Sequence, residues 1–298
     1  MIFSKVVSEQ LENYIQLVIA GISTGSIYGL IALAFLIIYN TTKIVNFAQG
    51  EMVMVGAMMA FFGIGISKFN YFGTILLVLA AMIVLSYVFR YALVAPLQRR
   101  GAPMFSIIIG TIAFGTVVSE GIGLWLGKQQ YGVPPIIPNN PIHFLNLSIL
   151  PQSLLIIIVS LVLVVAIWYF FHKTMIGLSL RAVAINPDGA KVSGINISRM
   201  VAIGFALSAL VSGIGGMLIA PVAGASPYMG LSIAVKGFAA AILGGMGNMY
   251  AGMVGGLIIG VIESLLSYNF AAYAEPITYG IMLFMLFVKP TGLFPEHS

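Results

Sequence analysis

Two polar segments interrupt an otherwise apolar chain and hold most of its chemically capable residues. The first is Asn46-Phe47-Ala48-Gln49-Gly50-Glu51, which follows a long apolar run and precedes a short one. A helix broken here would explain both the polarity and the short second run, since irregular backbone is tolerated beside a cavity or within protein. Glu51 is then a candidate for a solute pathway. The alternative is that Glu51 lies at an interface and pairs with Lys43.

The second segment, residues 177–200, predicts a short helix with both ends marked. Asn186 can cap it, the residue after Asn186 is a proline suited to the first helical position, and Asp188 favours the positive end of the dipole. Gly194 can close it in a left-handed conformation. Arg181, Lys191 and Arg199 make the segment cationic. We interpret it as a docking element; the alternative is an ordinary loop held by positive charge.

Composition places the chain in a membrane. Of its 298 residues 60% are apolar and 7% are charged, against about 25% charged in soluble domains. The net charge of +5 comes from cations between apolar runs, which indicates membrane orientation and not nucleic-acid binding. The chain has no cysteine, and its three histidines lie far apart, so the sequence offers no metal site.

The apolar runs predict an all-α polytopic protein, a single transmembrane domain over residues 1–298, with about eight to ten crossings. We expect outer loops at residues 128–151 and 221–235, and a brief polar turn at residues 269–276. The predicted spans are Ile15–Tyr39, Met52–Ile66, Tyr71–Ala95, Met104–Leu126, Gln152–Phe171, Met200–Ala220, Ala251–Tyr268 and Ile277–Val288, with a half-length or unwound segment at Gly237–Tyr250.

Glycines near the two ends of the chain form similar patterns. Glycine recurs every fourth residue at positions 21, 25 and 29 and again at 252, 256 and 260, which predicts smooth helix faces for close packing. A polar break follows the first stripe and a glycine-rich break, with Gly244, Gly245 and Gly247, precedes the second. This reversed order predicts an inverted repeat with a pathway at its interface. Glu263, near the end of the second stripe, joins the pathway candidates.

Cation counting predicts the orientation. One side of the predicted bundle would carry Lys43, Arg99, Arg100, Lys173, Arg181, Lys191, Arg199 and Lys289. The other side would carry Lys5, Lys68, Lys128 and Lys236. The richer side is expected to be cytoplasmic, which places the N-terminus outside and the C-terminus inside.

The sequence contains no catalytic pattern that fits an enzyme. No G-x-x-x-x-G-K-[ST] loop is present, so the chain lacks that means of binding ATP. A single aspartate excludes aspartate-rich metal sites and a paired-aspartate protease. Gly177-Leu178-Ser179 has no evident base at a fixed relation. The chain is therefore expected not to be an enzyme.

Four segments resemble the LivH/LivM family of branched-chain amino acid permeases. Asp188–Gly194 is similar to the E-A-A-x-x-x-G loop by which ABC importer permeases engage their ATPases, with Gly189 in place of the usual alanine and Ala190 next to it. NFAQGE resembles the family's N-F-A-H-G-E, with Gln49 in place of histidine. RAVAINPDGAKVSGIN resembles R-A-x-A-x-N-x-x-x-A-x-x-x-G-I-N, and the run from Lys236 to Leu265 resembles a glycine-rich family block.

The resemblance implies a type II-like ABC importer permease without a cofactor of its own. Its implied partners are a second permease subunit (related or identical), two cytoplasmic ATPases, an extracytoplasmic solute-binding protein and membrane lipid. Residues 172–200 would be the ATPase-coupling loop. The implied contact residues are Arg181, Asn186, Asp188, Gly189, Ala190, Lys191, Gly194 and Ile195.

The expected solute is a branched-chain or another hydrophobic, neutral amino acid, which suits a charge-poor interior. Urea or a short amide, which other members of the family carry, is the alternative within the family. Outside it, the alternatives are a secondary transporter driven by Na⁺ or H⁺ through Glu51 or Glu263, and a structural or receptor-like subunit without a pathway.

Overall fold

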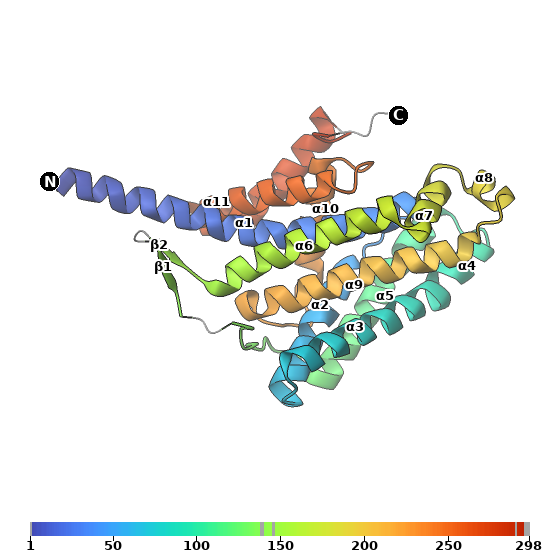
Figure 1. Ribbon diagram of the computed structural model, residues 1–298, viewed down its shortest axis with the longest axis horizontal. Coiled ribbons are helices and arrows are strands. Elements are labelled where there is room, and N and C mark those ends of the chain that lie inside the picture. Colours follow the sequence, from blue (N-terminus) through green and yellow to red (C-terminus); the bar gives the residue numbers. More distant parts are fainter. Residues whose placement is uncertain (1, 138–139, 145–146, 290, 295–298) are drawn as a thin grey trace.

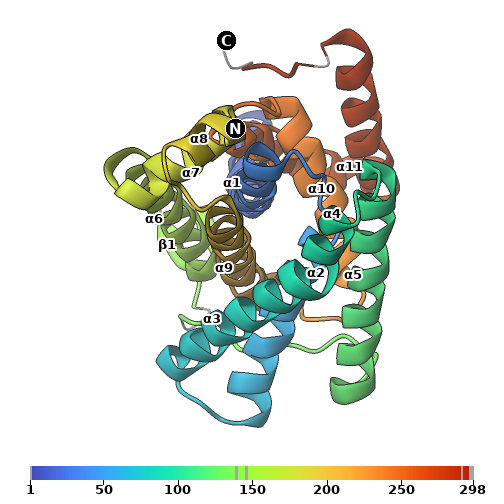
Figure 2. The same ribbon diagram turned by 90° about the vertical axis from the view of Figure 1, so that its right-hand side faces the viewer.

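The computed structural model is an elongated bundle of helices, shown along its length in Figure 1 and from one end in Figure 2. It describes residues 2–137, 140–144, 147–289 and 291–294. The elements are α1 (Ile2–Thr42), α2 (Gln49–Ala60), a π-helical turn η1 (Phe61–Ile66), α3 (Tyr71–Val88), a second π-helical turn η2 (Phe89–Val94), α4 (Ala95–Arg99), α5 (Met104–Leu126), β1 (Ile142–Phe144), β2 (Leu147–Ile149), α6 (Pro151–Lys173), α7 (Met175–Ile185), α8 (Pro187–Val192), α9 (Ile197–Ala223), α10 (Met229–Gly244) and α11 (Ala251–Val288).

The described residues include eight helical segments long and apolar enough to cross a membrane, so the predicted polytopic all-α class is confirmed. They are Glu12–Thr42, Gln49–Ile66, Tyr71–Arg99, Met104–Leu126, Pro151–Lys173, Ile197–Ala223, Ala251–Tyr268 and Phe270–Val288. α10 is apolar but shorter. The inverted repeat remains a prediction.

The predicted bounds of three segments differ from those in the structure. The expected outer loop at residues 221–235 is mostly helix, because α9 continues through Pro221 to Ala223 and α10 begins at Met229. Pro221 removes one backbone hydrogen bond, a loss that helices in membranes tolerate, and Gly224 (φ +77°) then ends the helix. The expected half-length or unwound segment at 237–250 is confirmed in kind, since the short helix α10 ends at Gly244 and residues 245–250 are not helical, but α10 begins earlier, at Met229. α1 begins well before the predicted Ile15.

The predicted polar turn at residues 269–276 is also largely helical. The helix of α11 is interrupted only at Phe270 (φ −138°, ψ 48°), which divides it into the last two spans. The last span, Phe270–Val288, runs back toward the C-terminal end of α10. The residues that follow it are bonded there, since the Leu293 and Phe294 N–H groups donate to the Leu243 and Gly244 carbonyl oxygens (both 2.9 Å). One distorted residue therefore suffices for the reversal.

The two predicted glycine stripes pack against each other. A Cβ atom on Gly21 would lie 2.6 Å from Val261 Cα, and one on Gly25 would lie 2.7 Å from the Gly256 carbonyl oxygen. These separations are shorter than real side chains allow, so α1 and α11 meet backbone to backbone, running in opposite directions. The stripes are thus one seam formed from the two ends of the sequence.

The two ends of the bundle differ in structure. Figure 1 shows the short β1–β2 hairpin and the N-terminus at one end, and α4, α7 and α8 at the other. β1 and β2 pair in antiparallel fashion inside the predicted connection at 128–151. We refer to the two ends as the hairpin end and the α8 end. The most buried spans, α1, α2 and α9, form the centre between them.

Candidate functional site

The predicted helix break lies between α1 and α2. Lys43 has a left-handed backbone (φ +56°), and residues 43–48 are not part of either helix. Asn46 holds the break together, because the Ala48 N–H donates to Asn46 Oδ1 (3.0 Å). Gln49, Gly50 and Glu51 form the first turn of α2. The break is therefore confirmed, but it lies at residues 43–48, three residues earlier than the predicted segment.

Gln49 is the centre of a buried polar cluster that joins the break to the middle of α9. Its Nε2 donates to the Ser212 hydroxyl, and its Oε1 accepts from Asn46 Nδ2 (3.3 Å) and from the Ser208 hydroxyl (3.1 Å). The Ser208 hydroxyl also reaches the Ala34 carbonyl oxygen of α1 (2.7 Å). All four side chains of the cluster are buried. We call Asn46, Gln49, Ser208 and Ser212 the amide–hydroxyl cluster. Neither serine was predicted as a site residue, because serine is also a common packing residue in membrane helices.

Gly50 and Glu51 lie against the first turn of α10. A Cβ atom on Gly50 would overlap the Gly230 carbonyl oxygen, so only glycine permits this approach. The Glu51 side chain occupies the space beside Gly230. It also packs against Gly115 of α5, where an added Cβ atom would lie 3.0 Å from Glu51 Cγ. α10 thus begins deep in the bundle, close to the level of the amide–hydroxyl cluster.

Glu51 does not form the ion pair with Lys43 that was one expectation. Its Oε2 is buried and has no hydrogen-bond partner among the described residues. The Lys43 Nζ instead lies 5.6 Å from the centre of the Tyr39 ring. Glu51 is therefore a carboxyl between α2, α5 and α10 that forms no ion pair among the described residues, and its place in a pathway stays a prediction.

Glu263 belongs to a separate charged cluster on the other side of α10. Lys236 Nζ lies 2.6 Å from Glu263 Oε1 and 3.1 Å from Glu275 Oε1. It also lies 5.6 Å from the centre of the Tyr28 ring of α1. Only 9% of the Lys236 side chain is exposed, so Lys236 lies inside the bundle and not in a loop, and its assignment to the outer side stays a prediction. A lysine within the apolar run of α10 was the signal that sequence reasoning missed.

The charged cluster borders a cavity of about 500 Å³ between α1 and α11. Tyr28, Thr24 and Glu263 are among the residues that line it. Glu263 Oε2 is buried and has no hydrogen-bond partner among the described residues. With two carboxylates against one ammonium, the cluster has an excess of negative charge beside an open space.

The glycine-rich segment that follows α10 lies at the α8 end and not beside Glu51. Gly245 (φ +128°) ends α10, and Asn40 Nδ2 of α1 donates to the Gly247 carbonyl oxygen (3.1 Å). A Cβ atom on Gly244 would overlap the Ala251 carbonyl oxygen. Gly244, Gly245 and Gly247 therefore form a tight connection between α10 and α11.

The predicted capped helix is α8. Asn186 Oδ1 accepts from the Gly189 N–H (2.9 Å), and Gly194 (φ +81°) follows the helix in the left-handed region. Asp188, Gly189 and Lys191 are exposed, whereas Ala190 is buried and Ile195 is partly buried. α8 therefore projects at the end of the bundle (Figures 1 and 2), and it is attached to the bundle through apolar contacts of Ala190 and Ile195.

Arg181 is separated from these exposed residues. It lies on α7, and its Nε is buried without a hydrogen-bond partner among the described residues.

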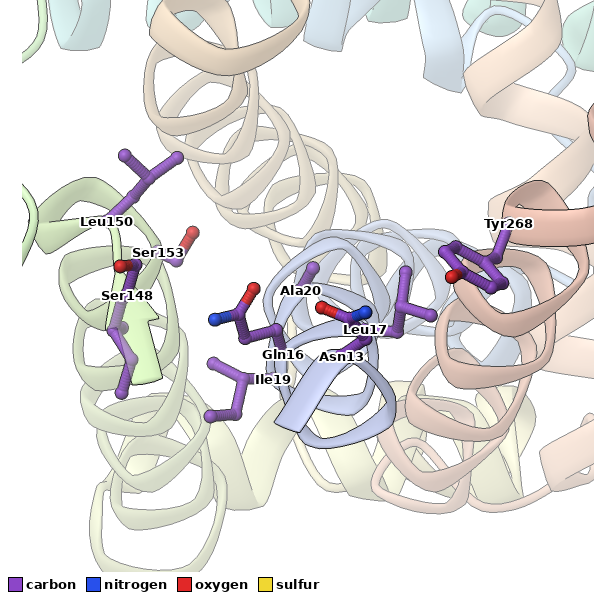
Figure 3. Close-up of a pocket in the computed structure, with 10 residues that line it drawn as sticks. Asn13, Gln16, Leu17, Ile19, Ala20, Ser148, Leu150, Ser153 and Tyr268 are labelled. Atoms are coloured by element: carbon purple, nitrogen blue, oxygen red, sulfur yellow. The ribbon is translucent and has the colours of Figure 1, made fainter. Parts of the chain in front are cut away.

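A cavity of about 350 Å³ lies at the hairpin end, with Asn13 and Gln16 of α1 between Ser153 of α6 and Tyr268 of α11 (Figure 3). None of the predicted site residues lines that cavity.

Comparison with known proteins connects the whole chain to membrane permeases. A family model described as "Branched-chain amino acid transport system / permease component" matches residues 17–288. The chain is 29% identical to the high-affinity branched-chain amino acid transport system permease protein LivH of Salmonella typhimurium, over 96% of this chain and 97% of that protein. It is 26% identical to the permease protein BraD of Pseudomonas aeruginosa, over 95% and 96%.

One solved structure shares the fold. PsaBC from Streptococcus pneumoniae, determined in complex with a Fab, superposes with a TM-score of 0.52 at 14% sequence identity. The match covers 98% of this chain and 97% of that chain. At this identity the likeness concerns the fold alone.

Proposed function

Because this chain belongs to the branched-chain amino acid transport system permease family, we propose that it carries branched-chain or other hydrophobic, neutral amino acids through the cell membrane as a subunit of an ABC importer. The observation that carries this proposal is similarity along almost the whole chain to permeases named for that transport. The chain is a transport subunit and not an enzyme, so the energy comes from separate ATPase subunits.

In this proposal, α8 is the element that contacts an ATPase. It is short, capped at Asn186, closed at Gly194, and exposed along one side. Val192 is 91% exposed although it is apolar, and such a side chain is a better source of binding energy than surface charges. Its buried Ala190 and partly buried Ile195 fix α8 to the bundle, so a displacement of α8 would reach α7 and α9.

The proposed pathway runs beside α10. Glu51 and the amide–hydroxyl cluster lie on one side of this helix, and the Lys236 cluster lies on the other. Hydroxyls, amides and a few charges suit a solute that is neutral overall, because such a solute needs few fixed charges. Gly50 and Gly230 let α2 and α10 touch, so their separation would open this region.

The proposed assembly has two permease subunits, one of which is this chain and the other a relative or a second copy. Two ATPases would bind at the α8 end, and a solute-binding protein would bind at the hairpin end. We therefore propose that the α8 end is cytoplasmic. The cation-rich segments around α4, α7 and α8 support this orientation through the positive-inside rule.

The coupling role can be tested with Gly194→Asp in the full-length chain, expressed together with candidate ABC ATPase subunits from the same organism. Gly194 has φ +81° and open space around it, so aspartate would disturb the end of α8 without affecting packing. We expect normal insertion but loss of ATPase co-purification. Gly101→Asp is the matched control, since Gly101 has φ +66°, open space, and a position outside α8.

Normal co-purification of the ATPases with Gly194→Asp would contradict the docking role of α8. Substrate class is tested separately by uptake of leucine, urea and acetamide through the assembled importer, with leucine expected to be preferred. Leucine uptake by this chain alone in proteoliposomes under an ion gradient would contradict the whole proposal.

A further inference from the structure

A pocket of about 270 Å³ at the α8 end has the properties of an anion site. It is formed where four parts of the chain meet: the end of α1, the end of α6, α7, and the segment between α10 and α11. Lys43, His172 and Arg181 line it, together with Tyr250. It lies apart from the amide–hydroxyl cluster and from the exposed side of α8.

Two buried polar groups in this pocket have no protein partner within the described part of the chain. One is Arg181 Nε and the other is the Tyr250 hydroxyl. Burial raises the pKa of the Tyr250 phenol, and the nearby Arg181 guanidinium acts in the opposite direction. Both groups are hydrogen-bond donors, and a buried donor without an acceptor is unfavourable. A bound acceptor would satisfy them together.

The charge of the pocket is of one sign. It is lined by Lys43 and Arg181, with His172 beside them, and by no acidic residue. Three of the acidic residues form ion pairs elsewhere in the described chain: Glu120 with Lys128, and Glu263 and Glu275 with Lys236. The acceptor that fits this pocket is therefore an anion.

The depth of the pocket points to the source of that anion. Trp168 and Tyr169, one turn before His172 on α6, are 44% and 59% exposed, and exposed Trp and Tyr near the end of a span mark the level of lipid headgroups. Ile185, which lines the pocket from α7, is 86% exposed. An apolar edge at headgroup level would accept the start of an acyl chain beside the polar pocket.

We infer that this pocket binds a phosphate-bearing anion through Arg181, Lys43 and the Tyr250 hydroxyl, and that the headgroup of an anionic phospholipid supplies it. Basic pockets between helices at the cytoplasmic side are suited to such headgroups. The guanidinium group would form charge-assisted hydrogen bonds with phosphate oxygens. The neutral acyl region would lie along α7.

The test uses the full-length chain in detergent, delipidated and titrated with phosphatidylglycerol or phosphatidylcholine while bound lipid is measured by native mass spectrometry. We expect phosphatidylglycerol to bind several-fold more tightly. Arg181→Gln should weaken it roughly tenfold, the loss expected for one charge-assisted hydrogen bond. Arg100→Gln, which changes an exposed arginine at the same end of the bundle but outside the pocket, should bind as the original chain does.

Further variants and probes distinguish the outcomes. Lys43→Gln removes an exposed cation of the pocket, so it provides a second measurement if Arg181→Gln does not fold. Competition of inorganic phosphate with phosphatidylglycerol, lost in Arg181→Gln, would support the phosphate site with free phosphate as its source. Equal binding of both lipids, or equal loss in Arg100→Gln, would overturn the proposal. So would unchanged lipid affinity in Arg181→Gln with loss of ATPase co-purification, which would assign Arg181 to an acidic group of the ATPase.

Discussion

Glycine and asparagine occur both in the interior around α2 and at the exposed helix α8, but their roles differ between the two regions. In the interior, Gly50 lets the α2 backbone touch Gly230 of α10, and Gly216 lets α9 touch Val53 of α2. At the end of α8, a Cβ atom added to Gly194 would meet nothing within 4 Å. Glycine is suited to this position because its backbone is left-handed (φ +81°). Interior glycines thus provide space, whereas Gly194 provides a conformation.

The asparagines differ in the same way. Asn46 is buried and its amide belongs to a cluster linking α2 to α9. Asn186 is exposed, and its side chain completes only the local backbone of α8. Changes in the interior should therefore appear as lost stability, and changes at α8 as lost partner binding. Four substitutions test this difference, in order of decreasing effect on the stability of the chain.

Gly216→Ala should have the largest effect. The added Cβ would overlap the Val53 carbonyl oxygen, which is backbone and cannot rotate away, so we expect a loss of at least about 2 kcal/mol from overpacking. Thermal unfolding of the purified chain measures it. Gly215→Ala is the matched control, because a Cβ atom there meets nothing within 4 Å. Equal unfolding temperatures for the two variants would contradict the close contact between α2 and α9.

Gln49→Leu should have the next largest effect, about 1–2 kcal/mol. Leucine has a similar volume but leaves Asn46 Nδ2 and the Ser212 hydroxyl without their partner, and hydrogen bonds between helices in membranes are worth about 1 kcal/mol each. Thermal unfolding again measures the change. Gln98→Leu, at an exposed position of α4, should be close to the original chain. A stabilised Gln49→Leu variant would show that the cluster serves function at the expense of stability.

Asn186→Ala should weaken α8 by about 1 kcal/mol, the usual value of a helix cap. Because α8 is exposed and short, global unfolding should change little, whereas ATPase co-purification should fall. Asn70→Ala removes the equivalent cap of α3, where Asn70 Oδ1 accepts from the Gly73 N–H (2.8 Å). That control lies at the start of α3, away from α8, and should leave ATPase binding intact. Equal loss of ATPase binding in both variants would contradict a specific role for α8.

Val192→Ala should leave stability unchanged. Its side chain is 91% exposed, so the free chain loses almost no packing. If Val192 fills a pocket on an ATPase, truncation should weaken that complex by about 1–2 kcal/mol, which titration of the purified ATPase would measure. An unchanged affinity would leave α8 without its apolar anchor, and the docking contact would then rest on Lys191 and other exposed polar groups.

Local patterns predicted the local structure well. The cap at Asn186 and the glycine at 194 act through backbone groups within four residues, so they can be predicted without knowledge of the fold. The break before α2 was predictable for a different reason: a polar run between two apolar runs is tolerated at membrane depth only beside a cavity or within protein. The loop expected at 221–235 was wrong because proline and glycine are ambiguous inside membrane helices.

The sequence by itself determined the membrane class, the positions of most spans and the ends of α8, because these depend on apolar length and on short-range backbone hydrogen bonds. Only the tertiary structure decided that Lys236 meets Glu263, that Gln49 meets Ser208 and Ser212, and that Arg181 turns toward Tyr250. Those pairings join residues far apart in the chain. They depend on how closely glycine-lined helices approach and on their rotation about their own axes, which a single sequence does not specify.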